Sequence, residues 1–409
     1  MPDDLTPTNP FRPGAGHMPL YLAGREEEKN EFRKLLKQEV ILDNMVLTGL
    51  RGVGKTVLLD TLKPIAIAEN WLWVGTDLTE ATSLSEERIV LRLFADMAVV
   101  TTGIEIGKKE LRRIGFGSSP KAEAQTLSFD ILYSVYHNTP GLVSDKLKAI
   151  LELAWTCIRM STGARGLIFA YDEAQNMSDK SEKEQFPLSL MLDVFQSIQK
   201  KGIPIMLVLA GLPTLFPKLV EARTFAERMF RVVFLDRLDD ASCRDAIKKP
   251  VEQSQCPFPL GDGLIDSIVT VSGGYPYFVQ FICREVYDAA LQMHREGKPL
   301  VVSIPDITRK LDTDFFTGRW ARATDRQREL LTVVAQLENS NEEFTVQEVV
   351  GKSAELLDKP FGPSQINQMF GTLSECGLIY KNRHGKYSFA VPLLGQFIAR
   401  QSIGQRSHP

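Results

Sequence analysis

The sequence has few cysteines, no cluster of histidines and no long apolar run. Its five cysteines are scattered and form no Cys-x-x-Cys pair, so neither a disulfide framework nor a zinc site is expected. The longest apolar stretch, residues 203–212, is too short to span a bilayer. The amino terminus lacks the basic start and apolar run of a signal peptide. These absences predict a soluble cytoplasmic protein that has no membrane partner.

An excess of positive charge is also missing. Lys and Arg number 48 against 51 Asp and Glu, which gives a net charge of −3. Nucleic acid could therefore be held only by a local basic patch. Hydrophobic residues at 44% and charged residues at 24% exclude a mostly disordered chain, and 409 residues favour two or three packed units.

Short apolar segments alternate with helical periodicity over the first 240 or so residues. The predicted strands are residues 44–48, 71–78, 167–173, 203–211 and 231–238. Continuously apolar strands separated by helices indicate an α/β fold, a parallel sheet covered on both faces. We predict an extended arm at 1–18, an α/β core at 19–238 with a helical insertion at about 95–160, a helical lid at 239–310 and a further domain at 311–409.

One loop between a predicted strand and a predicted helix matches the phosphate-binding pattern G-x-x-x-x-G-K-S/T in full. It reads Gly49-Leu50-Arg51-Gly52-Val53-Gly54-Lys55-Thr56. Its glycines let successive backbone N–H groups surround a β-phosphate, and Lys55 reaches the β- and γ-phosphates. Thr56 supplies a hydroxyl to Mg²⁺. Together with Val57, these residues are the predicted site for ATP and Mg²⁺, and we place Lys55 among the catalytic residues as well.

A second motif indicates hydrolysis. The apolar segment LIFAYDE ends in Asp172, which can hold the Mg²⁺ shell beside the phosphate-binding loop. The next residue, Glu173, can orient and deprotonate an attacking water. Another predicted strand, residues 71–78, lies between the two motifs in the sequence. An ATPase core with an inserted strand therefore fits better than the simpler strand order of a kinase. We therefore predict a P-loop NTPase sheet of the ASCE type and hydrolysis of ATP.

From Leu20 to Phe397 the sequence resembles the AAA+ ATPases and the signal-transduction ATPases with numerous domains (STAND), closest to their archaeal-type and origin-recognition-like branches. Residues 21–26 are similar to the segment that packs over the adenine in these families, which implies that Arg25 binds nucleotide. Residues 226–230 are similar to the segment that carries the arginine finger. The resemblance implies that Arg228 is this finger, with Arg223 and Arg231 as alternatives, and a finger that acts in trans implies an ATP-dependent homo-oligomer.

Two sensor positions depart from the AAA+ pattern. Where the resemblance places sensor 1, at the end of the fourth strand, this sequence offers Gly211 or Thr214 in place of the usual Asn. Near the usual position of the sensor 2 arginine stands Pro276. The segment around it, residues 272–278, resembles the Gly-x-Pro motif of STAND ATPases, in which the proline packs against the adenine. The absence of sensor 2 implies slow hydrolysis and a switch more than a motor.

The last hundred residues resemble a winged helix. The predicted elements are helices at 324–337, 345–357 and 363–376 and a hairpin of strands at 377–381 and 386–390. In such a fold the third helix can enter a major groove and the hairpin, or wing, can contact the DNA backbone.

The charges of this domain leave two uses open. Lys381, Arg383 and Lys386 put three cations on the wing, where they could contact double-stranded DNA. The third helix offers Gln365, Asn367 and Gln368 to base edges but carries no Lys or Arg. Packing against a protein therefore stands beside DNA contact as an equal alternative.

These patterns together predict an ATP-binding and ATP-hydrolysing molecular switch of the AAA+/STAND kind. It would couple the state of the nucleotide to association with DNA or to assembly with a partner. The alternative is a STAND-type signalling or adaptor protein whose winged helix packs on protein and whose output is an effector protein.

Overall fold

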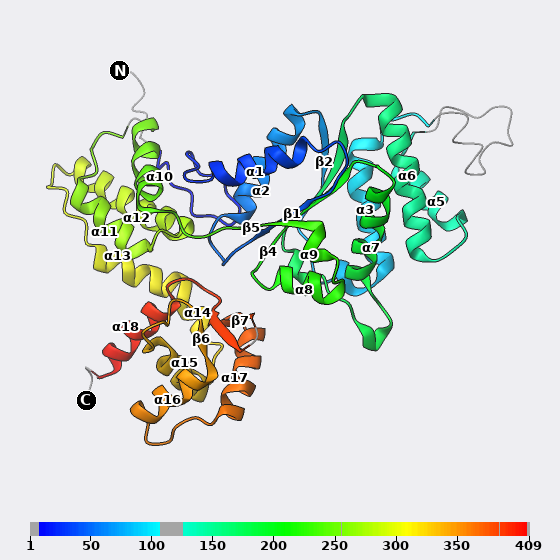
Figure 1. Cartoon of the computed structure of the whole chain (residues 1–409). Coiled ribbons are helices and arrows are strands. Elements are labelled where there is room, and N and C mark those ends of the chain that lie inside the picture. The colour runs from blue at the N-terminus through cyan, green and yellow to red at the C-terminus, as the bar shows by residue number, and fades with distance from the viewer. Residues whose placement is uncertain (1–7, 107–125, 255, 384, 407–409) are drawn as a thin grey trace, which may run out of the picture. The chain divides into compact units, whose positions relative to one another are not determined.

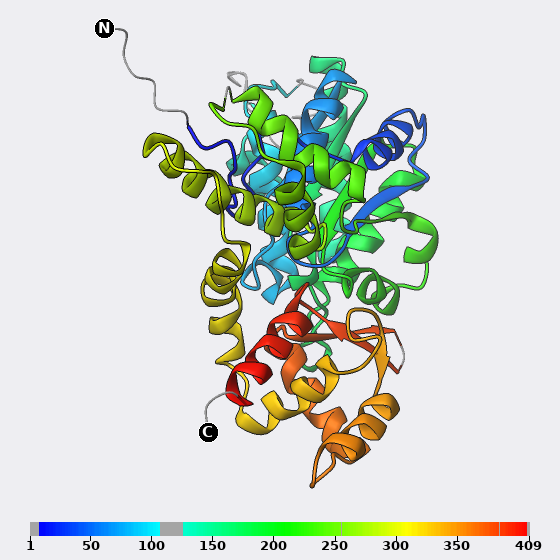
Figure 2. The ribbon, with the colours of Figure 1, turned by 90° about the vertical axis from the view of Figure 1, so that its left-hand side faces the viewer.

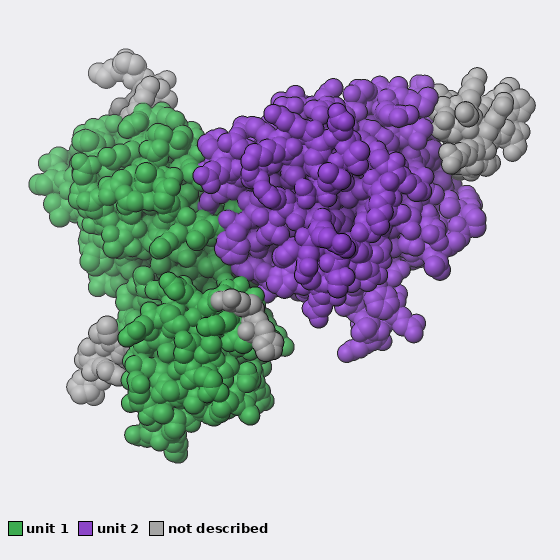
Figure 3. All heavy atoms as spheres, in the orientation of Figure 1, with its two compact units in different colours: residues 1–24, 50–54, 235–409 green, residues 25–49, 55–234 purple. Residues whose placement is uncertain are grey.

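The computed structural model describes residues 8–106, 126–254, 256–383 and 385–406. The chain divides into two compact units, which Figure 3 shows in different colours. The first, which we call the sheet unit, comprises Arg25–Gly49 and Lys55–Phe234. The second, the helical unit, comprises Met1–Gly24, Leu50–Gly54 and Leu235–Pro409. No helix among the described residues combines the length and the apolar character that crossing a bilayer requires.

The sheet unit is built on five parallel strands in the order β2-β3-β4-β1-β5. They are β1 (Asn44–Thr48), β2 (Trp71–Val74), β3 (Gly166–Tyr171), β4 (Ile205–Gly211) and β5 (Phe230–Phe234). Strands β1, β3 and β4 are buried along their whole length, as expected for a parallel sheet covered on both faces. Strand β4 lies between β1 and β3, so the predicted parallel sheet with an inserted strand is confirmed.

The two strands at the edges of the sheet end four residues earlier than predicted, because the chain leaves the sheet there. At Gly75 the backbone adopts φ +137°, and a Cβ there would lie 1.7 Å from the carbonyl oxygen of Ala170. The predicted strand 71–78 therefore ends at Val74. At the other edge of the sheet, β5 ends at Phe234 and not at residue 238.

Helices cover both faces of this sheet. They are α1 (Glu26–Leu36), α2 (Lys55–Ala68), α3 (Glu86–Thr101), α5 (Phe129–Asn138), α6 (Val143–Thr162), α7 (Pro187–Lys200), α8 (Leu215–Ala222) and α9 (Ala226–Met229). Helices α3, α5, α6 and α7 pack against one another on one side of the sheet, as Figure 1 shows. They include most of the predicted helical insertion, of which residues 107–125 lie outside the described residues.

The helical unit starts with four longer helices. They are α10 (Asp240–Gln253), α11 (Asp262–Ser272), α12 (Pro276–Arg295) and α13 (Ile304–Leu311). The described part of the predicted amino-terminal arm lies on α12, where Asn9 Nδ2 donates to the carbonyl oxygen of Arg284 (3.0 Å) and Phe11 packs edge-on against Tyr287. The finer boundaries proposed from the sequence, including one between lid and winged helix at residue 310, stay predictions.

The carboxyl-terminal part of this unit is a winged helix. After a π-helical stretch (Asp312–Thr317) and α14 (Gly318–Trp320), it contains α15 (Asp325–Ala335), β6 (Phe344–Thr345), α16 (Val346–Leu356), α17 (Pro363–Glu375), β7 (Ile379–Arg383) and β8 (Lys386–Phe389). The strands form an antiparallel sheet in the order β6-β8-β7, and α18 (Leu394–Arg406) packs against α15 (Figure 2). Side-chain caps explain two helix starts, since Thr324 with Gln327 and Thr345 with Glu348 form capping boxes. The winged helix predicted from the sequence is confirmed, with β6 as a strand that the pattern did not reveal.

Candidate nucleotide site

The phosphate-binding loop has the backbone that its glycines permit. Gly52 and Gly54 adopt φ values of +82° and +92°, in the left-handed region that favours glycine. A Cβ on Gly54 would meet nothing within 4 Å, whereas one on Gly52 would lie 3.1 Å from Tyr277 Cβ. The Tyr277 N–H also donates to the carbonyl oxygen of Gly52 (3.1 Å), a contact within the helical unit, to which residues 50–54 belong.

The residues that follow this loop begin α2 in the sheet unit. Lys55 is 8% exposed, and its Nζ donates to the carbonyl oxygen of Gly49 at 3.0 Å. Thr56 Oγ1 donates to Asp172 Oδ2, directly beyond the end of β3. Asp172 is 3% exposed. The two predicted Mg²⁺ ligands therefore lie side by side, and a hydroxyl beside a carboxylate offers the hard oxygen atoms that Mg²⁺ prefers.

Further carboxylates surround Asp172. Burial raises the pKa of Asp60, and the charge of Asp172 raises it further. Burial likewise raises the pKa of Asp77, to which the charges of Asp172, Glu173 and Asp60 add. Lys63 offsets part of the rise at Asp60, but for both groups burial and neighbouring carboxylates outweigh the positive charge that faces the ionised form. A bound divalent cation would supply that charge, so the residues present fit a Mg²⁺ ion.

Glu173 is exposed and sits in a left-handed backbone conformation with φ +52°. Its N–H donates to Asp172 Oδ1 at 2.7 Å, and its Oε2 accepts a hydrogen bond from Gln175 Nε2. Gln175 lies in a single helical turn, η2 (Ala174–Asn176), that follows β3. The predicted base is thus held at the end of β3 on the same edge as Lys55 and Thr56.

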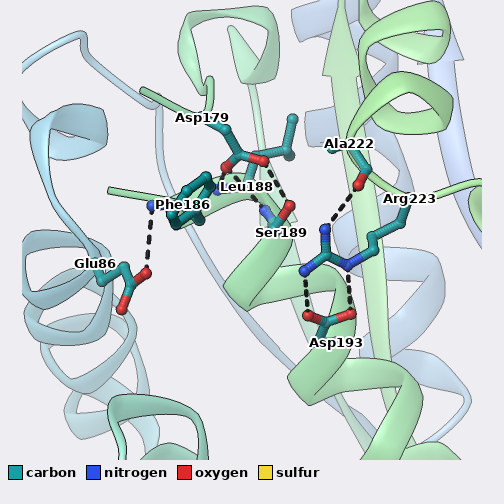
Figure 4. Close-up of polar contacts among 8 residues, drawn as sticks. All are labelled: Glu86, Asp179, Phe186, Leu188, Ser189, Asp193, Ala222 and Arg223. Carbon is teal, nitrogen blue, oxygen red and sulfur yellow. Dashed lines mark hydrogen bonds and ion pairs between the residues drawn. The ribbon is translucent and has the colours of Figure 1, made fainter. Parts of the chain in front are cut away.

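Three arginines were candidates for an arginine finger, and their surroundings differ. Arg223 forms two hydrogen bonds to Asp193 (2.8 and 2.7 Å), which raise its pKa (Figure 4). Arg231 binds Glu31 through two nitrogens (3.2 and 3.0 Å). Arg228 on α9 is exposed, and its side chain has no hydrogen bond or ion pair with any described residue.

The remaining predicted nucleotide contacts belong to different units. Arg25 is 5% exposed at the start of α1 in the sheet unit, where its Nη1 bonds Glu28 at 3.1 Å. Pro276 is the first residue of α12 in the helical unit, a position that suits proline because no N–H is needed there. The structure therefore brings Lys55, Thr56, Asp172 and Glu173 together within one unit, while Arg25 and Pro276 belong to different units.

The structure describes the side chains of two of the three cations predicted on the wing. Lys381 is exposed and Lys386 is half-buried, while the side chain of Arg383 lies outside the described residues. Arg400, another cation of this region, forms two bonds to Asp312 (2.9 and 2.5 Å). The polar residues predicted to face bases are all exposed on α17, namely Gln365, Asn367 and Gln368.

Comparison with known proteins extends this description. Residues 313–398 match a family model described as a domain of unknown function (DUF8462). A search of curated protein sequences finds no match. The structure is similar to the Walker-type ATPase PABY2304 of Pyrococcus abyssi, with 16% identity and a TM-score of 0.56 over 92% of this chain and 96% of that one. It is also similar to the ADP form of the ORC2 protein of Aeropyrum pernix, with 15% identity and a TM-score of 0.51 over 97% and 98% of the two chains.

The chain has the fold of the AAA+ P-loop ATPases. This confirms the fold that the sequence resemblance implied, over nearly the whole chain. The matched domain of unknown function begins within the π-helical stretch and ends within α18, so it coincides with the winged helix of this ATPase fold.

Sequence reasoning missed three polar residues of the site. Asp77 follows β2, and because β2 is parallel to β3 the ends of these strands meet beside Asp172. Asp60 lies one turn along α2 from Thr56, and the phosphate-binding pattern does not include its position. Gln175 follows the Asp-Glu pair closely, and its residue type alone gave no signal. Knowledge of the strand order would have pointed to Asp77.

Proposed function

We propose that this protein is an ATP-hydrolysing molecular switch. Residues 49–57 hold the phosphates of ATP, with Lys55 at the β- and γ-phosphates and with Thr56 and Asp172 at Mg²⁺. When bound, Mg²⁺ neutralises charge on the phosphate oxygens. Glu173 orients the attacking water and accepts its proton. The observation that carries the proposal is the contact of Thr56 with Asp172 at the end of β3, beside Glu173.

Hydrolysis by a single copy would be slow. Pro276 stands near the position at which AAA+ enzymes usually carry the sensor 2 arginine, and we propose that Arg228 acts on the nucleotide of a neighbouring copy. Arg228 is exposed, and its side chain has no hydrogen bond or ion pair with any described residue. This supports its role as the arginine finger. We therefore propose that ATP promotes a homo-oligomer, in which Arg25 and Pro276 contact the adenine and hydrolysis resets the assembly.

The output of the switch is proposed to be association with double-stranded DNA through Lys381, Arg383 and Lys386. A second candidate output is a signalling role in which the winged helix packs on an effector protein. Two observations favour this second candidate: α17 carries no Lys or Arg, and Arg400 is already paired with Asp312.

The experiment is a steady-state ATP hydrolysis assay with and without duplex DNA, with Mg²⁺ present and after its chelation. Glu173→Gln should lower kcat by about a hundredfold or more, the scale of general-base catalysis. Glu184→Gln is the matched control, because Glu184 is also exposed and also has a left-handed backbone (φ +53°). A turnover that is equal in the wild type and in Glu173→Gln would refute the catalytic assignment.

The same assay separates the two outputs. Stimulation by DNA that weakens with salt, and that is lost when Lys381 and Lys386 are replaced by Glu, would support DNA association. Hydrolysis that ignores DNA and tolerates both replacements would support the signalling role.

A further inference from the structure

The end of β4 lacks a side chain where the AAA+ pattern has a polar one. Strand β4 ends at Gly211, in register with Thr48 at the end of β1. A Cβ added to Gly211 would lie 2.6 Å from Gln175 Oε1. The carboxamide of Gln175 reaches this space from the turn after β3, and it is the nearest group to that Cβ, followed by Leu215 Cδ2 at 2.9 Å.

The hydrogen bonds of this carboxamide fix its orientation. Gln175 Oε1 accepts the N–H of Leu212 at 3.0 Å, so the amide nitrogen must point the other way, to Glu173 Oε2. A flipped amide would set two donors against each other at Leu212 and two acceptors against each other at Glu173. Gln175 is thus a link with a defined direction between the end of β4 and the carboxylate of Glu173.

The backbone that carries Gln175 is itself held from both sides. Asn176 Nδ2 donates to the carbonyl oxygen of Leu78 (2.8 Å), and Lys218 Nζ on α8 donates to the carbonyl oxygen of Gln175 (2.6 Å). Ala174, the first residue of the turn, is fully buried. A side chain on an anchored turn loses little further freedom when it binds Glu173, so it can position that carboxylate.

We propose that Gln175 is a positioning residue for Glu173 and takes the place of the sensor 1 side chain that Gly211 lacks. This rests on the proposed hydrolysis of ATP. The carboxamide holds Oε2 of Glu173 and leaves Oε1 to the attacking water. Because its other end is bonded to Leu212, a displacement of the end of β4 is passed to the base.

The test compares Gln175→Ala with wild type in steady-state ATP hydrolysis. The expected result is a kcat lower by about tenfold to a hundredfold, the scale of a misplaced catalytic group, with an unchanged KM and unchanged affinity for a non-hydrolysable ATP analogue. Gln196→Ala is the matched control, since Gln196 lies half-buried on α7 and its side chain has Lys200 as its one hydrogen-bond partner among the described residues.

The split between kcat and KM distinguishes positioning from a merely structural role. Loss of a hydrogen bond that orients Glu173 lowers kcat and leaves the affinity for the nucleotide unchanged, whereas a disturbed fold would change both.

A second pair of variants keeps the proposal testable if Gln175→Ala folds poorly. Gly211→Ala should displace the carboxamide and lower kcat, and Gln175→Ala with Gly211→Ala should be no slower than Gln175→Ala alone. Gln175→Ala with Gly211→Asn, which returns a polar group to β4, should recover part of the rate. An equal kcat for wild type and Gln175→Ala, with Glu173→Gln still impaired, overturns this inference and leaves the proposed function standing. A wild type no faster than Glu173→Gln overturns both this inference and the proposed function.

Discussion

Replacement of Asn44 should weaken the sheet unit more than its single side chain suggests. Asn44 is fully buried at the start of β1. Its Oδ1 accepts the N–H of Leu207 (2.7 Å) and Nε2 of Gln199 (2.8 Å), and its Nδ2 donates to Gln199 Oε1 and to the carbonyl oxygen of Met229 (both 3.2 Å). One carboxamide therefore ties β1 to β4, to α7 and to the residue before β5. It supports the register in which Thr48, the residue before the phosphate-binding loop, pairs with Gly211 at the end of β4.

The size of the effect follows from the groups left behind. In Asn44→Ala, the Leu207 N–H loses its side-chain acceptor, and the Gln199 amide loses both bonds to Asn44. A buried polar group without a partner costs about 1–3 kcal/mol. Some of these groups will recover a partner from water that enters the vacated space, so we expect a loss of about 3 kcal/mol in the free energy of unfolding. Asn44→Asp should be no better, because it adds a buried charge and sets an acceptor against Gln199 Oε1.

Urea denaturation followed by far-UV circular dichroism measures this loss. Asn30→Ala, at an exposed position on α1, is the control and should stay within about 0.5 kcal/mol of wild type. In a double-mutant cycle, Asn44→Leu with Gln199→Leu should cost less than the sum of the two single changes, since each single change orphans the other amide. A loss below about 1 kcal/mol for Asn44→Ala would refute the reasoning.

Two further predictions concern charge at the site. If Arg228 is a finger in trans, Arg228→Ala should lower the rate of ATP hydrolysis by about a thousandfold. Mixing Arg228→Ala subunits with Glu173→Gln subunits should restore part of that rate. The control, Arg231→Ala, should hydrolyse ATP at a rate near that of wild type. Asp77→Asn should stabilise the protein near pH 7, because burial and the charge of Asp172 raise the pKa of Asp77 and so make its ionisation oppose folding. The gain in the free energy of unfolding should be less than about 1 kcal/mol after solvent screening. It should vanish as the pH falls toward the ordinary carboxyl pKa of 3.8. Thermal denaturation across that pH range would measure it.

Elements whose residues interact locally were predictable from the sequence. Strand β1 has the predicted bounds, since a short, mainly apolar run before a glycine depends only on neighbouring residues. The end of β2 was not predictable in this way. Gly75 ends that strand through its close approach to Ala170, a residue almost a hundred positions later that only the folded sheet brings near.

The residues of the candidate site likewise fall into those that the neighbouring sequence identifies and those that only the fold identifies. Lys55 and Thr56 could be identified because the loop that places them is continuous in sequence, and Asp172 with Glu173 because an apolar strand precedes them. Gln175 could not, because its role depends on what β4 lacks. Once β3 and β4 are known to be neighbours, the residues that follow Asp172 must meet the residues that end β4. A glycine at the end of β4 then makes room for a side chain from the turn after β3, and a glutamine there can satisfy both a backbone N–H and a carboxylate. The polar group of this site is therefore defined by a pair of positions, Gly211 and Gln175, and neither position alone reveals it.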